Sequence, residues 1–210
     1  MNPWIDLVMV CLVLSNLMLV GSSRIGVCIR FVALQGILLG LLPLTLHHWF
    51  LAAVSIAIKG IVFPWLLFRA MREANVRREV EPYVGFSSSL LIGVATLVVS
   101  SRLATRLPSP LPAISTLILP VALFTMITGL FLIVSRRQAL TQVIGYLALE
   151  NGVFTFGMGF VREAPVIVEM GILLDIFVAV FVMGITIFHI SREFDQIDTE
   201  QLTSLKDTAS

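Results

Sequence analysis

Long apolar stretches separated by short polar breaks fill most of this chain of 210 residues. A helix that crosses a bilayer needs about 20 mostly apolar residues, at a rise of about 1.5 Å each. The segments that meet this requirement lie near residues 3–22, 26–46, 49–69, 84–101, 113–135, 138–160 and 166–190. The pattern therefore predicts an all-α, polytopic membrane helix bundle of about seven transmembrane helices, followed by a polar tail.

The basic residues between these segments predict the orientation, because short cytoplasmic loops are enriched in Lys and Arg. With the N-terminus outside, the outer side receives Arg102, Arg106 and Arg162. The cytoplasmic side then receives Arg24, Arg30, Arg69, Arg72, Arg77, Arg78, Arg136, Arg137, Arg192 and Lys206. We therefore expect an outside N-terminus and a cytoplasmic C-terminus.

Composition agrees with a membrane protein and narrows its chemistry. Hydrophobic residues make up 58% and charged residues 13% of the chain, about half the charged share of a soluble domain. The net charge of +1 argues against nucleic acid, which requires a clustered basic face. Cys11 and Cys28 lie in different segments with no CxxC or Cys/His cluster, so we expect no iron–sulfur, zinc, nickel–iron or flavin site in this chain.

Three ionisable residues, Lys59, Glu150 and Asp175, lie inside predicted spans. Each costs about 2.5–3.5 kcal/mol there on insertion scales. Each is about nine or ten residues from the outer end of its span, which places all three roughly 13–15 Å deep, at the bilayer midplane. Spans six and seven are joined by a short turn, so Glu150 and Asp175 are expected on neighbouring antiparallel helices.

Two carboxyl groups in a low-dielectric bundle resist being ionised together, and a carboxyl that exchanges its proton readily is a usable proton carrier. Glu150 and Asp175 therefore predict a proton relay at mid-membrane, with Lys59 as its third member. The alternative is a structural hydrogen bond or a buried ion pair between helices. For Lys59, an ion pair with a neighbouring subunit is a further alternative.

Three other residues are supporting positions of this relay. Glu169 lies about one turn inside the seventh span, where a solvated edge residue and a proton-uptake residue are the two alternatives. Tyr146 and Asn151 are one turn and one residue from Glu150 and are candidates for hydrogen bonds near it.

Small residues and one proline predict local features of the helices. Gly36 and Gly40 form a GxxxG pattern, and Gly152 adds a small-residue surface, as at close helix contacts in lipid. Pro64 should bend its helix and free a carbonyl one turn earlier.

Around these residues the chain resembles hydrogenase-4 component E. The resemblance lies in residues 135–152, which contain Gly-Tyr-Leu-Ala-Leu-Glu-Asn-Gly, and in residues 164–183, which contain Asp-Ile-Phe-Val-Ala-Val-Phe-Val-Met. Residues 202–206 are similar as well. The last three spans of that family resemble the K-type subunit of respiratory complex I, which has one mid-membrane glutamate on its second span and one on its third. Glu150 matches the first, whereas Asp175 lies near the second but is an aspartate after a shorter loop.

The resemblance implies a non-catalytic membrane subunit of a group 4 [NiFe]-hydrogenase or a related oxidoreductase complex, in the cytoplasmic (inner) membrane of a prokaryote. It implies antiporter-like and other membrane subunits as partners, surrounded by lipid, and hydrophilic redox subunits that hold the [NiFe] and iron–sulfur centres. Residues 1–110 are then a four-helix extension, 111–190 a three-helix K-type unit and 191–210 a polar cytoplasmic tail.

The function expected from these features is translocation of protons, or of sodium ions, through mid-membrane carboxyl groups. One alternative is an independent secondary transporter, which should have an internal repeat and a broken-helix substrate site; Pro64 beside Lys59 is the one feature that matches it. The other alternative is a scaffold that only anchors its partners.

Overall fold

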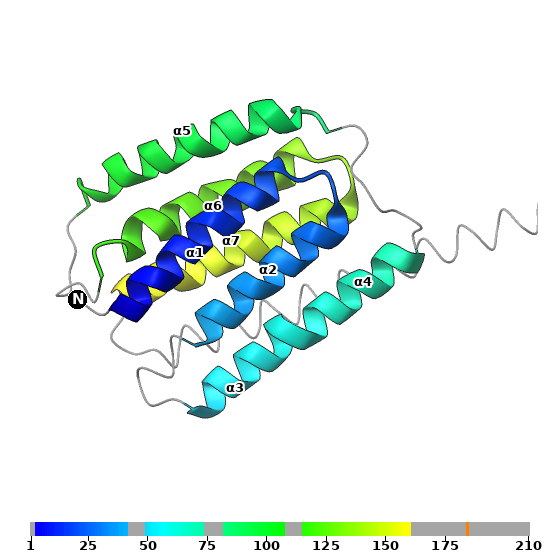
Figure 1. Ribbon diagram of the computed structural model, residues 1–210, viewed down its shortest axis with the longest axis horizontal. Coiled ribbons are helices and arrows are strands. Elements are labelled where there is room, and N and C mark those ends of the chain that lie inside the picture. The colour runs from blue at the N-terminus through cyan, green and yellow to red at the C-terminus, as the bar shows by residue number, and fades with distance from the viewer. Residues whose placement is uncertain (1–2, 42–48, 74–81, 108–114, 161–183, 185–210) are drawn as a thin grey trace, which may run out of the picture.

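The computed structural model describes residues 3–41, 49–73, 82–107, 115–160 and 184. The regular elements in these ranges are helices (Figure 1). They are α1 (Pro3–Gly21), α2 (Ile25–Gly40), α3 (Trp49–Ala57), α4 (Phe63–Glu73), α5 (Phe86–Ala104), α6 (Ile118–Ser135) and α7 (Ala139–Phe160). A π-helical segment, η2 (Ile58–Val62), joins α3 to α4. The predicted all-α class is confirmed for these residues.

The helices lie side by side in one bundle, and successive long helices run in opposite directions (Figure 1). α6 and α7 pack against each other, with α1 and α2 beside them. α5 lies along α1 and α6 at one edge, whereas α3, η2 and α4 form a rod along α2 at the opposite edge. This order places α7 close to both α2 and the rod.

The interior of the bundle has an apolar layer at each end. One buried cluster contains Ile29, Leu67 and Ile144, and the other contains Met9 and Leu39. Between the two layers, at mid-height, the buried side chains are largely polar; they include Ser15, Asn16, Gln35, Thr125, Thr128, Glu150, Asn151 and Thr155.

The surface of the bundle suits lipid. Among the described residues, four helices are long and apolar enough to cross a membrane, namely Pro3–Gly21, Ala52–Glu73, Phe86–Ala104 and Ile118–Ser135. Large apolar side chains stand exposed along them, among them Trp4, Leu7, Leu14, Leu91 and Val98. Exposed apolar side chains along helices of this length suit the acyl chains of a bilayer. The chain is therefore a multi-pass membrane protein.

The predicted spans and the observed helices agree in part. The spans near 3–22, 84–101, 113–135 and 138–160 correspond to α1, α5, α6 and α7. In the span predicted at 26–46, α2 ends at Gly40, and residues 42–48 lie outside the described ranges. The seventh predicted span, 166–190, also lies outside them apart from residue 184, so the count of seven stays a prediction.

The third predicted span contains the one irregular turn within these helices. The N–H of Phe63 bonds to the carbonyl of Ile58, five residues earlier, which is the spacing of a π turn. The next residue, Pro64, has no N–H with which to continue an α-helical ladder. The irregular turn therefore stands directly before the proline, as the loss of a donor there predicts.

Glycines bring the backbones of α6 and α7 into direct contact. A Cβ added to Gly129 would lie 2.3 Å from the backbone nitrogen of Leu149, and one added to Gly152 would lie 2.6 Å from that of Met126. Helices in lipid associate largely through such close packing. Sequence analysis identified Gly152 as a packing residue but missed Gly129.

Arg136 is buried, although the sequence assigns it to the basic cytoplasmic loops. Its side chain is 1% exposed, and Nη2 donates a hydrogen bond of 2.7 Å to the carbonyl of Val20 near the end of α1. Its guanidinium lies 4.6 Å from the centre of the Phe86 ring at the start of α5. A cation at a helix C-terminus satisfies carbonyls that lack a helical partner. Arg136 therefore ties α1, α5 and α6 together.

Candidate functional site

Lys59 and Glu150 form an ion pair inside the bundle. Lys59 Nζ lies 2.5 Å from Glu150 Oε1, and the two side chains are 12% and 3% exposed. Glu150 is at the middle of α7, and Lys59 is on η2 at the middle of the α3–η2–α4 rod. The structure thus brings together two of the three mid-membrane residues predicted from the sequence, from segments 91 residues apart.

The local backbone of the rod brings Lys59 close to α2 and α7. A Cβ added to Gly36 on α2 would lie 2.5 Å from the Cβ of Lys59, so glycine is needed for the two helices to approach this closely. Gly60 makes the reciprocal contact, since its added Cβ would lie 2.7 Å from Ile37 Cγ1. The GxxxG pattern predicted for helix packing therefore supports the site itself, because it seats the rod on α2.

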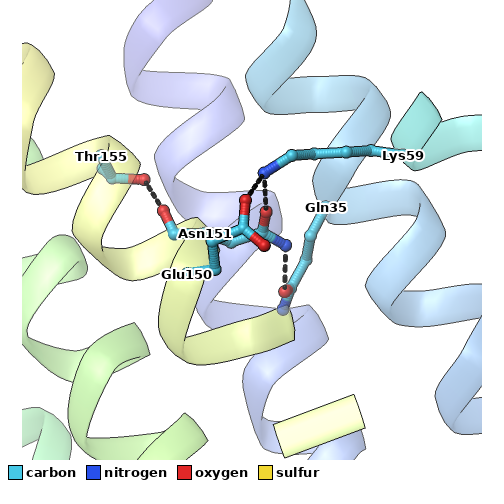
Figure 2. Close-up of polar contacts among 5 residues, drawn as sticks. All are labelled: Gln35, Lys59, Glu150, Asn151 and Thr155. Atoms are coloured by element: carbon cyan, nitrogen blue, oxygen red, sulfur yellow. Dashed lines mark hydrogen bonds and ion pairs between the residues drawn. The ribbon is translucent and has the colours of Figure 1, made fainter. Parts of the chain in front are cut away.

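Asn151 is the second partner of Lys59. Lys59 Nζ donates to Asn151 Oδ1 at 3.3 Å, and Asn151 Nδ2 donates to Gln35 Oε1 on α2 at 3.4 Å (Figure 2). The side-chain hydroxyl of Thr155 donates to the backbone carbonyl of Asn151 at 2.7 Å. The sequence predicts Asn151 as a support near Glu150; in the structure its side-chain oxygen accepts a hydrogen bond from Lys59.

Further polar side chains continue the network away from Glu150. Gln35 Nε2 donates to Ser15 Oγ at 2.9 Å and to Asn16 Oδ1 at 3.1 Å, both on α1. Asn16 Nδ2 donates to Thr125 Oγ1 on α6 at 2.8 Å. The network therefore joins α7, the rod, α2, α1 and α6 at one level of the bundle.

Sequence analysis missed Gln35 and Asn16 as site residues. Both are neutral amides, whereas the charge pattern of the spans points only to ionisable side chains. The available signal was that an amide inside an apolar span needs a hydrogen-bond partner, since its burial without one is costly.

The remaining predicted positions have different outcomes. Tyr146 is half-buried and packs against the apolar cluster that contains Ile144. Asp175 and Glu169 lie outside the described residues, so their predicted roles stay predictions.

The electrostatics of the pair follow from its burial. An ammonium and a carboxylate attract each other strongly where water is scarce, and removing either one leaves a buried charge alone, at a cost of about 3–5 kcal/mol. The second carboxylate oxygen, Glu150 Oε2, is buried and has no hydrogen-bond partner among the described residues. Glu150 thus pairs with Lys59 through Oε1, whereas Oε2 accepts no hydrogen bond from the described residues.

The groups of this network can hold a charge. Within the described residues, no three His, Cys, Asp or Glu side chains come together as metal ligands. The described network consists of one carboxylate, one ammonium, amides and hydroxyls, which can hold a proton or fix a charge.

Comparison with known proteins shows what the chain is related to. Over 204 residues the chain is 29% identical to hydrogenase-4 component E of Escherichia coli K12, with 93% of this chain and 94% of that protein covered. It is 31% identical over 204 residues to the uncharacterised protein Rv0085 of Mycobacterium tuberculosis, with 93% of each covered. The chain belongs to the hydrogenase-4 component E family. Its residues 117–207 also match the family described as NADH-ubiquinone/plastoquinone oxidoreductase chain 4L. No solved structure matches it with significance.

The family assignment divides the site between two parts of the chain. The chain 4L match begins just before α6 and contains Glu150 and Asn151, whereas Lys59, Gln35 and Asn16 precede it. Hydrogenase-4 component E and chain 4L are named as parts of larger enzymes, and this chain is related to both. Its ion pair joins the matched part to the part that precedes it.

Proposed function

We propose that this chain is a non-catalytic subunit that passes protons, or sodium ions, across the membrane by way of Glu150. The observation that supports this most strongly is the Lys59–Glu150 pair, buried at the middle of two helices. Ionisable side chains at mid-membrane are costly and are typical of ion pathways.

In this proposal the proton is taken up and released at the Glu150 carboxyl group. With Oε1 paired to Lys59, Oε2 is the oxygen that receives the proton. Protonation neutralises the carboxylate and weakens the ion pair, and release of the proton restores it. Glu150 then exchanges its proton with Asp175, while Glu169 serves uptake at the membrane edge and Tyr146 supports the helix that holds Glu150.

The setting of the subunit is part of the same proposal. Seven spans with an outside N-terminus place the site at the midplane of a prokaryotic inner membrane. Residues 1–110 form an extension to a K-type unit at 111–190, and residues 191–210 form a cytoplasmic tail. Antiporter-like membrane subunits adjoin the site, and hydrophilic subunits supply the [NiFe] and iron–sulfur chemistry. The basic residues among the described ones support this orientation, since Arg24, Arg69 and Arg72 lie at one end and Arg102 and Arg106 at the other.

Substitution of the pair in the intact complex tests the proposal. Glu150→Gln and Lys59→Met should each lower proton translocation per turnover by at least about tenfold, since a positioned acid–base group typically contributes 10²–10⁴-fold. Translocation is measured by the quenching of a pH-sensitive dye in vesicles that contain the complex, and subunit composition by gel electrophoresis. The complex should assemble normally.

A second ion pair in the same chain offers matched controls. Arg69 Nε and Glu73 Oε1 are 2.7 Å apart on one exposed face of α4, where an ion pair contributes little. Arg69→Met and Glu73→Gln should therefore leave translocation unchanged.

The alternatives predict other results. A scaffold predicts full translocation in Glu150→Gln and Lys59→Met at normal assembly, and that outcome would overturn the proposal. An independent transporter predicts ion uptake by this chain reconstituted alone in liposomes, where a subunit should show none.

A further inference from the structure

Three buried amide side chains extend from the ion pair across the bundle. They are Asn151 on α7, Gln35 on α2 and Asn16 on α1, and we call them the amide row. The row begins where Lys59 donates to Asn151, and successive members are joined by hydrogen bonds of 3.4 and 3.1 Å. Its members are 0–2% exposed, so the row lies inside the protein along its whole length.

The chemistry of Lys59 determines the direction of every bond in the row. An ammonium group only donates, so Asn151 must present its oxygen to Lys59. The NH₂ group of Asn151 is then left to donate to Gln35, whose oxygen must face it. Gln35 in turn donates from Nε2 to the oxygen of Asn16. Each amide therefore directs its oxygen toward Lys59 and its NH₂ group away from it.

The far end of the row is anchored by hydroxyl groups. Gln35 Nε2 also donates to Ser15 Oγ, and Asn16 Nδ2 donates to Thr125 Oγ1. Each hydroxyl donates to a backbone carbonyl of its own helix at 2.8 Å. Neither a helix carbonyl nor a neutral amide gains or loses protons readily. The row is therefore a rigid, oriented support rather than an outlet for protons.

We propose that Gln35 and Asn16 are positioning residues, which act through Asn151 to hold the Lys59 ammonium opposite Glu150 while Glu150 gains and loses its proton. This inference rests on the proposed function and deepens it. When Glu150 is neutral, the attraction between the two side chains is weakened, and lysine has a long flexible stem. Asn151 then remains a hydrogen-bond partner of the ammonium group and helps to keep it in place.

Gln35 is the critical member because it prevents Asn151 from turning over. A flipped Asn151 would direct its NH₂ group at the ammonium and leave two donors facing each other. Gln35 opposes this flip, since its own oxygen needs the NH₂ group of Asn151 and its own NH₂ group is held by Ser15 and Asn16. The part of the chain before the chain 4L match thus fixes the orientation of the Asn151 amide inside it.

A double-mutant cycle in the intact complex tests this role. Gln35→Met keeps the approximate volume and removes the amide; it should lower translocation per turnover about tenfold, as expected for losing support of a charged hydrogen bond. In a Lys59→Met background the same change should lower it by less than about twofold, because Gln35 acts only through Lys59. Gln142→Met is the matched control, since Gln142 donates to the Arg136 carbonyl outside the row.

The possible results separate this inference from the proposed function. Two results would overturn the positioning role and leave the proposed function standing. One is that the losses of translocation multiply fully in the double variant. The other is that Gln35→Met translocates normally while Glu150→Gln is inactive. If Glu150→Gln itself translocates normally, the function fails, and the same cycle is measured on the thermal unfolding of the complex. Non-additive effects there support the positioning of Lys59, and additive effects overturn it.

Asn16→Leu provides a second variant if Gln35→Met prevents assembly. It removes the next amide in the row and should show a smaller loss that likewise disappears in the Lys59→Met background. Additive losses for Asn16→Leu would overturn the inference in the same way.

Discussion

Lys59 contacts side chains of its own bundle in the structure. Sequence analysis left open whether Lys59 faces its own bundle or a neighbouring subunit. The structure answers this, because Nζ contacts both Glu150 and Asn151 of the same chain. A cation held between a carboxylate and an amide oxygen acts as a counter-charge, which is why we assign the proton itself to Glu150.

At the residue scale, removing one member of the Lys59–Glu150 pair should destabilise the protein more than removing both. Lys59→Met alone leaves a buried carboxylate without its counter-charge, which costs about 3–5 kcal/mol. The double variant Lys59→Met with Glu150→Met replaces both charges with apolar groups and should recover most of this loss. The measurement is the midpoint of thermal unfolding of the purified complex. A double variant that is less stable than Lys59→Met would contradict the pairing.

At the scale of the helices, the seating of the rod on α2 decides whether the site forms. Two glycines on α2 differ in what they contact. An added Cβ on Gly36 would meet Lys59 Cβ at 2.5 Å, whereas one on Gly26 would meet Phe68 and Met71 at 3.6 Å or more. The first distance requires a backbone shift, and the second is ordinary van der Waals contact.

Gly36→Ala should therefore push the rod away from α2 and lengthen the Lys59–Glu150 contact. We expect a translocation defect approaching that of Lys59→Met, together with a lower thermal midpoint. Gly26→Ala, on the same helix, should be neutral or slightly stabilising, because alanine favours a helix over glycine by about 0.5–1 kcal/mol. Equal behaviour of the two variants would show that close packing at Gly36 does not support the site.

At the scale of the whole molecule, the bundle arranges its polar side chains in one layer between two apolar ones. The apolar clusters occupy the two ends, and the network from Glu150 to Thr125 lies between them. In the proposed membrane setting, this layer is at the bilayer midplane. The Lys59–Glu150 pair is then equally far from the two aqueous phases.

Accessibility labelling tests this orientation. In a background of Cys11→Ala and Cys28→Ala, a cysteine at Ser23, between α1 and α2, should react with a membrane-impermeant maleimide only from the cytoplasmic side. A cysteine at Thr105, just after α5, should react only from the outside. The reverse pattern would invert the topology, and labelling of both positions from one side would be incompatible with α2, the rod and α5 all crossing the membrane.

Sequence alone determined that the protein is a membrane helix bundle and where most of its helices lie. It also showed that Lys59 and Glu150 are two of the three costly residues within the predicted spans, the third being Asp175. These features follow from local properties, since an apolar run of sufficient length and a charge within it are visible without contacts. Only the tertiary structure decided that the two residues pair, that Gln35 and Asn16 support them and that Arg136 is buried. The physical reason is that a helix in lipid is apolar both toward its neighbours and toward the acyl chains. Periodicity therefore does not reveal which face is inward, and the partner of each polar side chain depends on how the helices pack.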